Sequence, residues 1–364
     1  MKAVILAGGE GTRLRPLTCN TPKPMVPILN RPFLEHMLGH LKGHGVDHAI
    51  VTLCYLPDKI KAHFGDGEGV GMHLSYMLEE RPLGTAGAVK NVEEALHEAF
   101  FVLNGDIFTD LDLKAMVRFH REKRAQVTLF LTPVENPASF GVVETDPEGR
   151  VLRFLEKPSP GETSSNWING GVYFMEPQAL SHAPAREFHM FERGLFPRLL
   201  ELGVPVYGYR ARPYWMDVGT PASYLRVHRE LLLGSSARPG IEPGDENSQI
   251  HPSAQVLGPV LLGQGCRVEP GSVIRGPAVL GAGCVVGQGA LVQGSVLWRG
   301  VSVERGASLI DCIIGDGARI GEGTTVGEGC IVGDNVTLGK ANRIEGGMVL
   351  WPGESPKAGT ISTS

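Results

Sequence analysis

Met1-Lys-Ala-Val-Ile-Leu-Ala-Gly8-Gly9-Glu10-Gly11-Thr12-Arg13 opens the chain and decides the class of its first domain. A short apolar strand, Ala3 to Ala7, runs directly into a glycine-rich loop that carries one cation. Glycines let the backbone turn sharply and approach a ligand, and successive backbone N–H groups in such a turn form a concave anion site. The forked guanidinium of Arg13 suits phosphate. The stretch therefore predicts a strand followed by a polyphosphate cradle.

Two well-known nucleotide motifs do not fit this loop. A Rossmann fingerprint requires a third glycine where this chain has Leu14, and a Walker P-loop ends in Gly-Lys-Ser/Thr where this chain has Gly-Thr-Arg. The following prolines stiffen the segment Thr21-Pro22-Lys23-Pro24-Met25-Val26-Pro27, which presents a second cation. The loop and this segment together indicate a different nucleotide site.

Both segments resemble the signature of the nucleotide-sugar pyrophosphorylases (sugar-1-phosphate nucleotidylyltransferases), a glycine-rich loop ending Gly-Thr-Arg-Leu followed by Pro-Lys-Pro. The resemblance continues through about residue 233, and the remainder matches the β-helix tail of many members. It implies catalytic roles for Arg13 and Lys23 on the phosphates. The nucleotide-binding residues that it implies in this region are Leu6, Ala7, Gly8, Gly9, Gly11, Thr12, Arg13 and Lys23.

Up to about residue 233, apolar strands alternate with helical patterns. We expect buried strands at 47–53 and 100–103, and helices at 33–42, 86–99 and 113–123. This alternation predicts an α/β domain, a Rossmann-like and mostly parallel sheet with helices on both faces. Ligands of such sheets bind at the carboxyl ends of the strands, where the glycine loop and the 104–106 turn are expected.

A six-residue period starts at Ile250 and predicts a parallel β-helix of hexapeptide repeats, which the resemblance implies to be left-handed and three-sided. A Gly, Pro and Ser-rich stretch precedes it and predicts a linker. We divide the chain into a nucleotidyltransferase catalytic domain (1–233), a linker (234–249), the β-helix (250–350) and a C-terminal tail (351–364). The expected inward positions are Ile250, Val256, Leu262, Val268, Ile274, Leu280, Val286, Val292 and Trp298, then after a slip Val303, Leu309, Ile314, Ile320, Val326, Val332, Leu338, Ile344 and Leu350.

Four of the six cysteines lie in these repeats. Cys266 and Cys284 are 18 residues apart, one three-sided coil, and Cys312 and Cys330 repeat that spacing. We expect each pair to stack at neighbouring inward positions, about 4.8 Å apart in backbone terms. A redox or metal pair is the alternative, and we interpret them as small apolar filler.

Composition limits the class of protein and its partners. A length of 364 residues predicts two domains. Net charge −5 and mean hydropathy −0.02 are typical of a soluble protein with neither nucleic acid nor an anionic membrane as partner. The apolar start is too short for a signal peptide, and no Cys-x-x-Cys pair occurs, so we expect reduced thiols and a cytoplasmic location.

Phosphoryl-type transfer depends on neutralising the charge of the phosphates and positioning the substrates, more than on moving protons. Asp106 ends the sequence Asn-Gly-Asp after an apolar strand, and a carboxylate at a strand end suits Mg²⁺. The resemblance pairs Asp106 with Asp217, in Trp-Met-Asp-Val-Gly-Thr, as a metal site. It therefore implies Mg²⁺ as the cofactor and both carboxylates as catalytic residues.

Three further segments match those that bind the sugar phosphate. Lys157 offers a compact charge for the phosphate as a catalytic residue, and Glu156 can accept hydrogen bonds from sugar hydroxyls. Gly141 and Gly170 would allow close approach of the sugar, and Asn169 would contact its hydroxyls.

The segment 79–87 matches the one that meets the base, with Gly84 opening a helix. A carboxylate of Glu79 or Glu80 can accept from both donors on one edge of guanine, whereas thymine or uracil suits Gln better. An acidic helix flank without a ligand is the alternative. The motifs and tail are most similar to the mannose-1-phosphate guanylyltransferases, which form GDP-mannose and pyrophosphate from GTP and mannose 1-phosphate. Thymidylyl- and uridylyltransferases acting on glucose 1-phosphate are the alternative.

Two other classes fit less well. Regulatory relatives without catalysis usually lose the loop or a metal carboxylate, and both are intact here. An acyltransferase in the β-helix would need a histidine base, and the single repeat histidine, His251, lies in the first hexad. We therefore interpret the β-helix as an assembly or regulatory module and expect a homo-oligomer.

Overall fold

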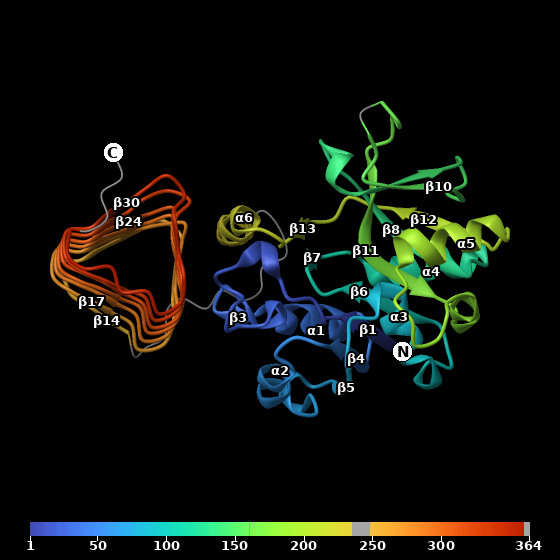
Figure 1. Cartoon of the computed structure of the whole chain (residues 1–364), viewed down its shortest axis with the longest axis horizontal. Helices are drawn as coiled ribbons and strands as arrows, with labels where there is room; N and C mark the ends of the chain where they lie inside the picture. Colours follow the sequence, from blue (N-terminus) through green and yellow to red (C-terminus); the bar gives the residue numbers. More distant parts are fainter. Residues whose placement is uncertain (160, 235–247, 360–364) are drawn as a thin grey trace. The chain divides into compact units, whose positions relative to one another are not determined.

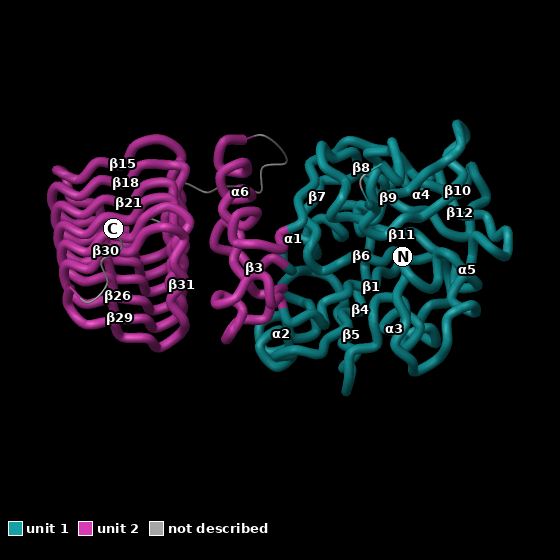
Figure 2. Tube along the Cα trace, turned by 45° about the horizontal axis from the view of Figure 1, so that its top comes forward, with its two compact units in different colours: residues 1–10, 34–217 teal, residues 11–33, 218–364 magenta. Residues whose placement is uncertain are grey.

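The computed structural model describes residues 1–159, 161–234 and 248–359 (Figure 1). It contains two compact units, the first formed by Met1–Glu10 and Leu34–Asp217 and the second by Gly11–Phe33 and Val218–Ser364 (Figure 2). Most of the predicted linker, residues 235–247, and the end of the predicted tail, 360–364, lie outside the described residues. Of the glycine loop, Gly8 and Gly9 fall in the first unit and Gly11 falls in the second.

A nine-stranded sheet forms the centre of the first unit. Its strands β5, β4, β1 and β6 lie side by side in parallel, and β11 then joins β6 in antiparallel pairing. The predicted α/β class is confirmed, with a mixed sheet, since β11 is also antiparallel to β8 and β9. The strands are β1 (Lys2–Leu6), β4 (His48–Leu53), β5 (His73–Leu78), β6 (Phe100–Asn104), β8 (Val127–Pro133), β9 (Gly141–Thr145), β10 (Val151–Glu156), β11 (Trp167–Met175) and β12 (Val206–Arg210).

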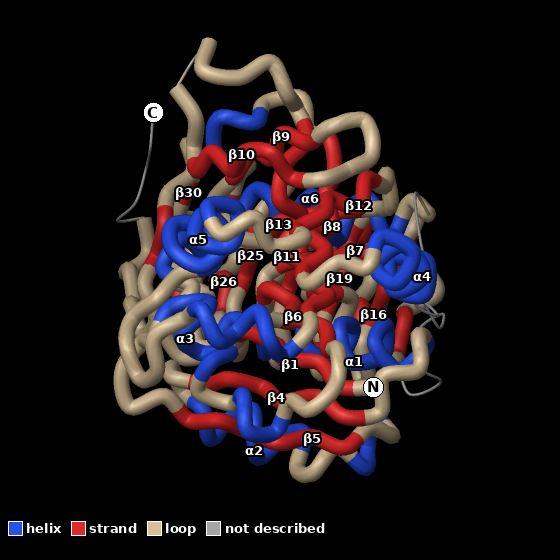
Figure 3. Tube along the Cα trace, turned by 90° about the vertical axis from the view of Figure 1, so that its right-hand side faces the viewer, coloured by secondary structure: helices blue, strands red, loops and turns tan. Residues whose placement is uncertain are grey.

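Helices cover both faces of this sheet (Figure 3). On one face, Val4 and Val102 share a core cluster with apolar residues of α3 and α5. Side chains alternate along a strand, so the neighbouring Phe101 lies on the other face, where Phe174 packs against it and against His120 of α4. The helices of this unit are α1 (Phe33–Gly43), α2 (Pro57–Phe64), α3 (Gly84–Lys90), α4 (Leu113–Lys123) and α5 (Phe196–Glu201).

The helix predicted at 86–99 is wrong in length, because α3 ends at Lys90 and a 3₁₀ turn, Glu93–Ala95, follows. Val89, Val92 and Leu96 are all buried in the core, so the helical spacing of apolar residues is real. The backbone nevertheless leaves the helix at Val92, with φ −113° and ψ 11°. Asn and a β-branched residue in sequence are poor helix formers. The other two helices and both strands agree with prediction to within one residue at each end.

The repeats form three parallel sheets of six strands each, which confirms the predicted β-helix. The first sheet contains β14 (Gln249–Ile250), β17 (Arg267–Val268), β20 (Val285–Val286), β23 (Ser302–Val303), β26 (Arg319–Ile320) and β29 (Thr337–Leu338). The second contains β15 (Gln255–Leu257), β18 (Val273–Arg275), β21 (Leu291–Gln293), β24 (Ser308–Ile310), β27 (Thr325–Val326) and β30 (Arg343–Ile344). The third contains β16 (Val260–Leu262), β19 (Ala278–Leu280), β22 (Val296–Leu297), β25 (Ile313–Ile314), β28 (Ile331–Val332) and β31 (Val349–Leu350).

The predicted register is wrong at Trp298, because Leu297 takes the inward position. Leu297 lies opposite Leu280 in β19 and Ile314 in β25, and it belongs to the buried core of the β-helix. The coil is one residue short between Val292 and Leu297, and both Leu and Trp are apolar, so the sequence pattern hid the shift. Trp298 consequently leaves the core cluster.

The predicted inward residues Ile250 and Val256 are also not buried, with 47% and 38% of their surface exposed. They belong to the first described coil, whose strands pair on one side only. A terminal repeat has no preceding neighbour to cover it, which explains the exposure.

The four repeat cysteines occupy the stacked, fully buried positions that their 18-residue spacing predicts, and all are free thiols. Sγ of Cys284 donates to the carbonyl of Trp298 over 2.9 Å, and Sγ of Cys266 to that of Gly281 over 3.2 Å. Both thiols therefore satisfy their hydrogen bonds within the coil, as expected of core filler.

Two short strand pairs and one helix lie outside these sheets. Strands β7 (Ile107–Thr109) and β13 (Trp215–Asp217) pair in the first unit. In the second unit, β2 (Pro27–Ile28) pairs with β3 (Arg31–Pro32), and α6 (Pro221–Leu232) precedes the repeats. No helix in the described ranges is long and apolar enough to cross a membrane.

Candidate active site

The carboxyl ends of four parallel strands meet at one edge of the sheet. Leu6 lies opposite both Thr52 of β4 and Asn104 of β6, and Leu53 lies opposite Leu78 of β5. The Ala7 amide donates to the carbonyl of Thr52 over 3.1 Å, so the chain continues along this edge toward Gly8 and Gly9. This is the edge at which ligands of α/β sheets bind.

The turn after β6 is held against the end of β1. The Gly105 amide donates to the carbonyl of Leu6 over 2.9 Å. A Cβ atom at Gly105 would lie 2.4 Å from that same carbonyl oxygen, so this position accepts only glycine. Asp106, the next residue, is thereby placed at the edge with its side chain partly exposed.

Asp217 is brought to the same place from a distant part of the chain. In the β7–β13 pair, Asp217 lies opposite Ile107, the residue that follows Asp106. The Tyr214 amide donates to the Asp110 carboxylate over 2.7 Å, and the Trp215 indole donates to the Gly170 carbonyl over 2.9 Å, so the Trp215 end of this pairing is anchored. The pairing therefore brings the backbone of Asp217 close to that of Asp106.

Two carboxylates fit a hard divalent cation that takes its other ligands from substrate phosphates and water. Within residues 1–159, 161–234 and 248–359, no group of three or more His, Cys, Asp or Glu side chains could hold a metal ion. Two carboxylates are a donor set of the kind that Mg²⁺ uses, because this ion takes its other ligands from phosphates and water.

The remaining loop residues, Gly11, Thr12, Arg13 and Lys23, belong to the second unit. Gly11 has φ +65° and begins the 3₁₀ turn Thr12–Leu14, and the Thr18 hydroxyl donates to its carbonyl over 2.8 Å. A Cβ atom at Gly11 would lie 3.2 Å from Cβ of Lys23, so the loop and the proline-rich segment pack closely together. Lys23 is buried.

The sugar-phosphate candidates converge through strand pairing. Glu156 lies opposite Gly141 in the β9–β10 hairpin, and Ile168 lies opposite Val142, which places Asn169 and Gly170 beside them. Lys157 is exposed, with a left-handed backbone (φ +53°) and its amide bonded to the Phe140 carbonyl over 3.1 Å. A non-glycine residue in this conformation costs about 1–3 kcal/mol and is typical of functional sites.

The Asn169 amide group has two partners within the protein, since it donates to the Tyr173 hydroxyl over 2.8 Å and accepts from the Gly171 amide over 3.1 Å. Tyr173 is fully buried, as a core residue. Asn169 therefore also has a structural role.

Glu192 is a half-buried acid that the sequence interpretation missed. Its carboxylate accepts from the Tyr173 hydroxyl (3.4 Å) and from the Thr85 hydroxyl (3.2 Å). Burial raises the pKa of Glu192, and the charge of Glu156 adds to that shift. An acidic residue inside the apolar run Met190-Phe-Glu-Arg-Gly-Leu-Phe was the one available signal.

The two base-contact candidates differ in environment. Glu79 is buried, its Oε2 accepts from the Leu83 amide over 2.9 Å, and burial raises its pKa. A Cβ atom at Gly8 would lie 3.4 Å from Glu79 Oε1, so this carboxylate borders the glycine loop. Glu80 is exposed. Gly84 has φ +72° at the start of α3, where a Cβ atom would meet the His189 carbonyl at 2.6 Å.

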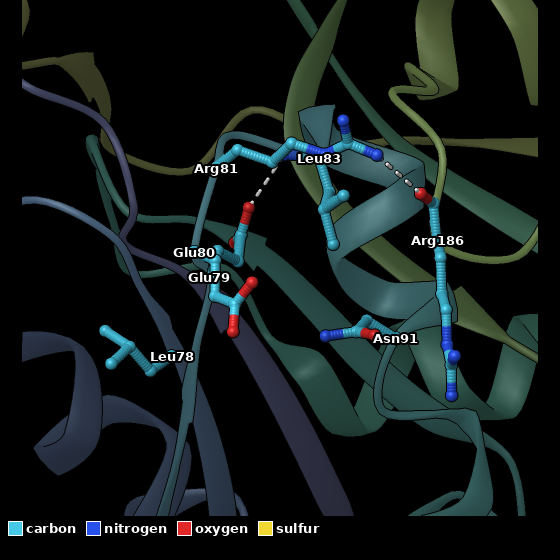
Figure 4. Close-up of a pocket in the computed structure, with 7 residues that line it drawn as sticks. All are labelled: Leu78, Glu79, Glu80, Arg81, Leu83, Asn91 and Arg186. Carbon is cyan, nitrogen blue, oxygen red and sulfur yellow. Dashed lines mark hydrogen bonds between the residues drawn. The ribbon is translucent and has the colours of Figure 1, made fainter.

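A cavity of about 650 Å³ lies beside these acids. The acids and Leu78 lie on one side of it, and Asn91 and Arg186 lie on the other (Figure 4). Arg81 closes one end by donating to the Arg186 carbonyl over 3.4 Å. Sequence reasoning missed Asn91 and Arg186, since neither lies in a recognisable motif.

Comparisons with known proteins match both parts of the chain. The family model described as nucleotidyl transferase matches residues 2–233. A second model, described as the EIF2B subunit epsilon LbH domain, matches residues 244–344.

Curated relatives and solved structures agree with these matches. A mannose-1-phosphate guanylyltransferase of Mycobacterium tuberculosis is 39% identical over 73% of this chain and 76% of its own length. A UTP–glucose-1-phosphate uridylyltransferase of Synechocystis is 36% identical over 74% of this chain and 75% of its own. HddC from Yersinia pseudotuberculosis, complexed with GMP-PN, is 29% identical with a TM-score of 0.54, over 62% of this chain and 97% of that one.

Proposed function

The chain belongs to the nucleotidyl transferase family, and from this premise we propose that it transfers a nucleotidyl group from an NTP to a sugar 1-phosphate. An oxygen of the sugar phosphate attacks the α-phosphorus, the bond from that phosphorus to the bridging oxygen breaks, and pyrophosphate leaves. The proposed substrates are GTP and mannose 1-phosphate. The observation that carries the proposal is the β7–β13 pairing, which sets the backbone of Asp217 opposite the residue after Asp106, where the preceding Gly105 amide bonds to the end of β1.

The proposed cation roles follow from charge and position. Arg13 and Lys23 neutralise the leaving pyrophosphate, and Lys157 holds the incoming phosphate. The left-handed backbone and exposed side chain of Lys157 support this role. Glu156 and Asn169, on the two strands that flank β9, contact the sugar hydroxyls.

We propose that Asp106 and Asp217 hold Mg²⁺ together with the phosphates. When bound, the ion supplies charge neutralisation at the phosphate oxygens. Asp106 is partly exposed, which leaves room for non-protein ligands and supports a shared site.

The base assignment rests on the acidic pair. Glu80 is the better-placed acceptor for guanine, because one oxygen of Glu79 already accepts from the Leu83 amide. The guanylyltransferase relative and the GMP-PN complex of HddC support guanine, and the uridylyltransferase relative supports the alternative pair of UTP and glucose 1-phosphate.

Three further assignments are proposals. The catalytic domain spans 1–233, followed by the linker and the β-helix with boundaries as predicted. Free cysteines support a reducing, cytoplasmic location. The β-helix forms a homo-oligomer, which light scattering would measure.

Pyrophosphate release across a grid of NTPs and sugar 1-phosphates tests the function. We expect GTP with mannose 1-phosphate to give the highest kcat/KM. Glu80→Gln should lower the preference for GTP over UTP by about tenfold or more, through loss of a charge-assisted hydrogen bond. Glu79→Gln serves as the matched comparison and should shift that preference less. Preference for UTP or dTTP in the unaltered protein would favour the alternative, and no turnover with any pair would favour a regulatory relative.

A further inference from the structure

One longitudinal edge of the β-helix, after its third sheet, bonds to the signature segment Gly11–Phe33 and to α6, all within the second unit. Asn30 Nδ2 donates to the Leu280 carbonyl over 2.9 Å at the end of β19. Asn20 Nδ2 donates to Asp334 Oδ2 over 3.2 Å, two residues after β28. Contacts thus extend over several coils of the same edge.

Trp298 is the bulky residue in the middle of this edge. It directly follows β22, and Trp351 holds the same repeat position after β31. Trp298 is 3% exposed, whereas Trp351 is 47% exposed. Glycine occupies this position in the three other coils from 281 to 333, so the coil itself does not require a large side chain there.

A chain of hydrogen bonds runs from Trp298 to the signature segment. The indole Nε1, which can only donate, lies 2.9 Å from the Tyr224 hydroxyl oxygen. That hydroxyl donates to the Pro27 carbonyl over 2.5 Å. His228, one helical turn later, also lies 3.2 Å from the Pro27 carbonyl and packs on the Tyr224 ring. These bonds lie among buried side chains, where hydrogen bonds are strong and polarise one another.

Pro27 belongs to the same stiff segment as Lys23. The Val26 amide donates to the Lys23 carbonyl over 3.1 Å, and the Phe33 amide donates to the Val26 carbonyl over 3.0 Å. Prolines at 22, 24 and 27 restrict the backbone between these bonds. A change in the position of Pro27 is therefore transmitted to the turn that carries Lys23.

We propose that Trp298 and Tyr224 are positioning residues for nucleotide binding, by which the β-helix holds the Lys23 turn in its ligand-ready conformation. This inference rests on the proposed function, in which Lys23 contacts the NTP phosphates. By this inference, the β-helix contributes to the affinity for the NTP without supplying a catalytic acid or base.

Full-length variants test the proposal. Trp298→Phe keeps an aromatic ring but removes the indole donor, and Tyr224→Phe removes the hydroxyl. We expect each to raise the KM for the NTP about fivefold, as for loss of one buried hydrogen bond, and to lower the thermal midpoint by a few degrees, with the KM for sugar 1-phosphate nearly unchanged. The double variant should lose little more than either single one, because both break the same chain. Trp351→Phe is the matched control and should behave as the unaltered protein.

Amide hydrogen exchange in the ligand-free chain provides a readout that does not need turnover. Exchange over residues 23–33 should quicken in Trp298→Phe and Tyr224→Phe, but not in Trp351→Phe. Unchanged NTP KM and unchanged exchange in both variants would overturn the inference. An equal rise in both substrate KM values would also overturn it in favour of a purely structural role. If the unaltered chain had no turnover, the proposed function would fail, and the exchange rates alone would decide whether the contact holds the segment.

Discussion

Parallel strand pairs occur in both the nine-stranded sheet and the β-helix, but the two regions distribute polar residues differently. The sheet pairs strands out of chain order, as β5, β4, β1 and β6, so its edge collects residues from distant segments. The β-helix pairs each strand with one a coil further along, so neighbours repeat the same position. A site for group transfer needs several different side chains close together, and the edge of the sheet is where such side chains meet.

The β-helix departs from its own repeat at the position that makes a new contact. The short coil before Leu297 turns Trp298 out of the core toward Tyr224, whereas Trp351 at the same position stays largely exposed. The contact of the β-helix with α6 thus lies at a departure from the repeat, whereas the candidate site of the sheet lies at its strand ends.

The largest expected effect comes from replacing single carboxylates by amides in each region. Asp106→Asn and Asp217→Asn should each lower kcat/KM by about 10³-fold, or about 4 kcal/mol, since an amide is a poor Mg²⁺ ligand. Glu345→Gln in the β-helix, which breaks an exposed pair with Arg343, should change turnover less than about twofold. Steady-state kinetics with thermal melts would measure both. Near-normal activity of either Asp variant would remove that residue from the metal site.

Shortening one buried side chain in each region compares how the two regions contribute to the free energy of unfolding. Ile5→Ala in β1 and Ile320→Ala in β26 each empty a fully buried site and should cost about 3 kcal/mol of unfolding free energy in denaturant titrations. Ile5 directly precedes Leu6 and the glycine loop, so its variant should also lose turnover below its melting range. Comparable loss of turnover in folded Ile320→Ala would show that the repeat core itself supports catalysis.

Lowering the pH should reduce the stability of the first unit more than that of the β-helix. Burial, with the nearby His44, lowers the pKa of His40 in α1 to about 4 from its usual 6.5. Between these values the unfolded chain binds more protons than the folded one, so stability falls as pH falls from 6.5 toward 4. His40→Gln should recover about 1–2 kcal/mol of the stability lost between pH 7 and pH 5, as denaturant titrations at the two pH values would measure.

The matched control is His97→Gln, an exposed histidine of the same unit. The repeats carry a single histidine, His251, and it is exposed. Equal pH dependence of the His40→Gln variant and the unaltered protein would contradict this assignment.

The sequence by itself determined the features that depend on neighbours along the chain. The apolar run into Gly8 specified a strand and turn, and the hexapeptide period specified stacked coils and the buried cysteines. Both signals are local, because a strand or coil repeats its pattern within a few residues.

The tertiary structure alone decided what depends on residues far apart. The β7–β13 pairing places Asp217 beside Asp106, a proximity that the sequence supplied only through family resemblance. Glu192 and Arg186 enter the site region through packing, without any motif. The break of α3 at Val92 and the outward turn of Trp298 were hidden, since the apolar pattern continues through both. The periodic pattern shows which residues are apolar. What each of them contacts depends on how segments far apart in the chain come together.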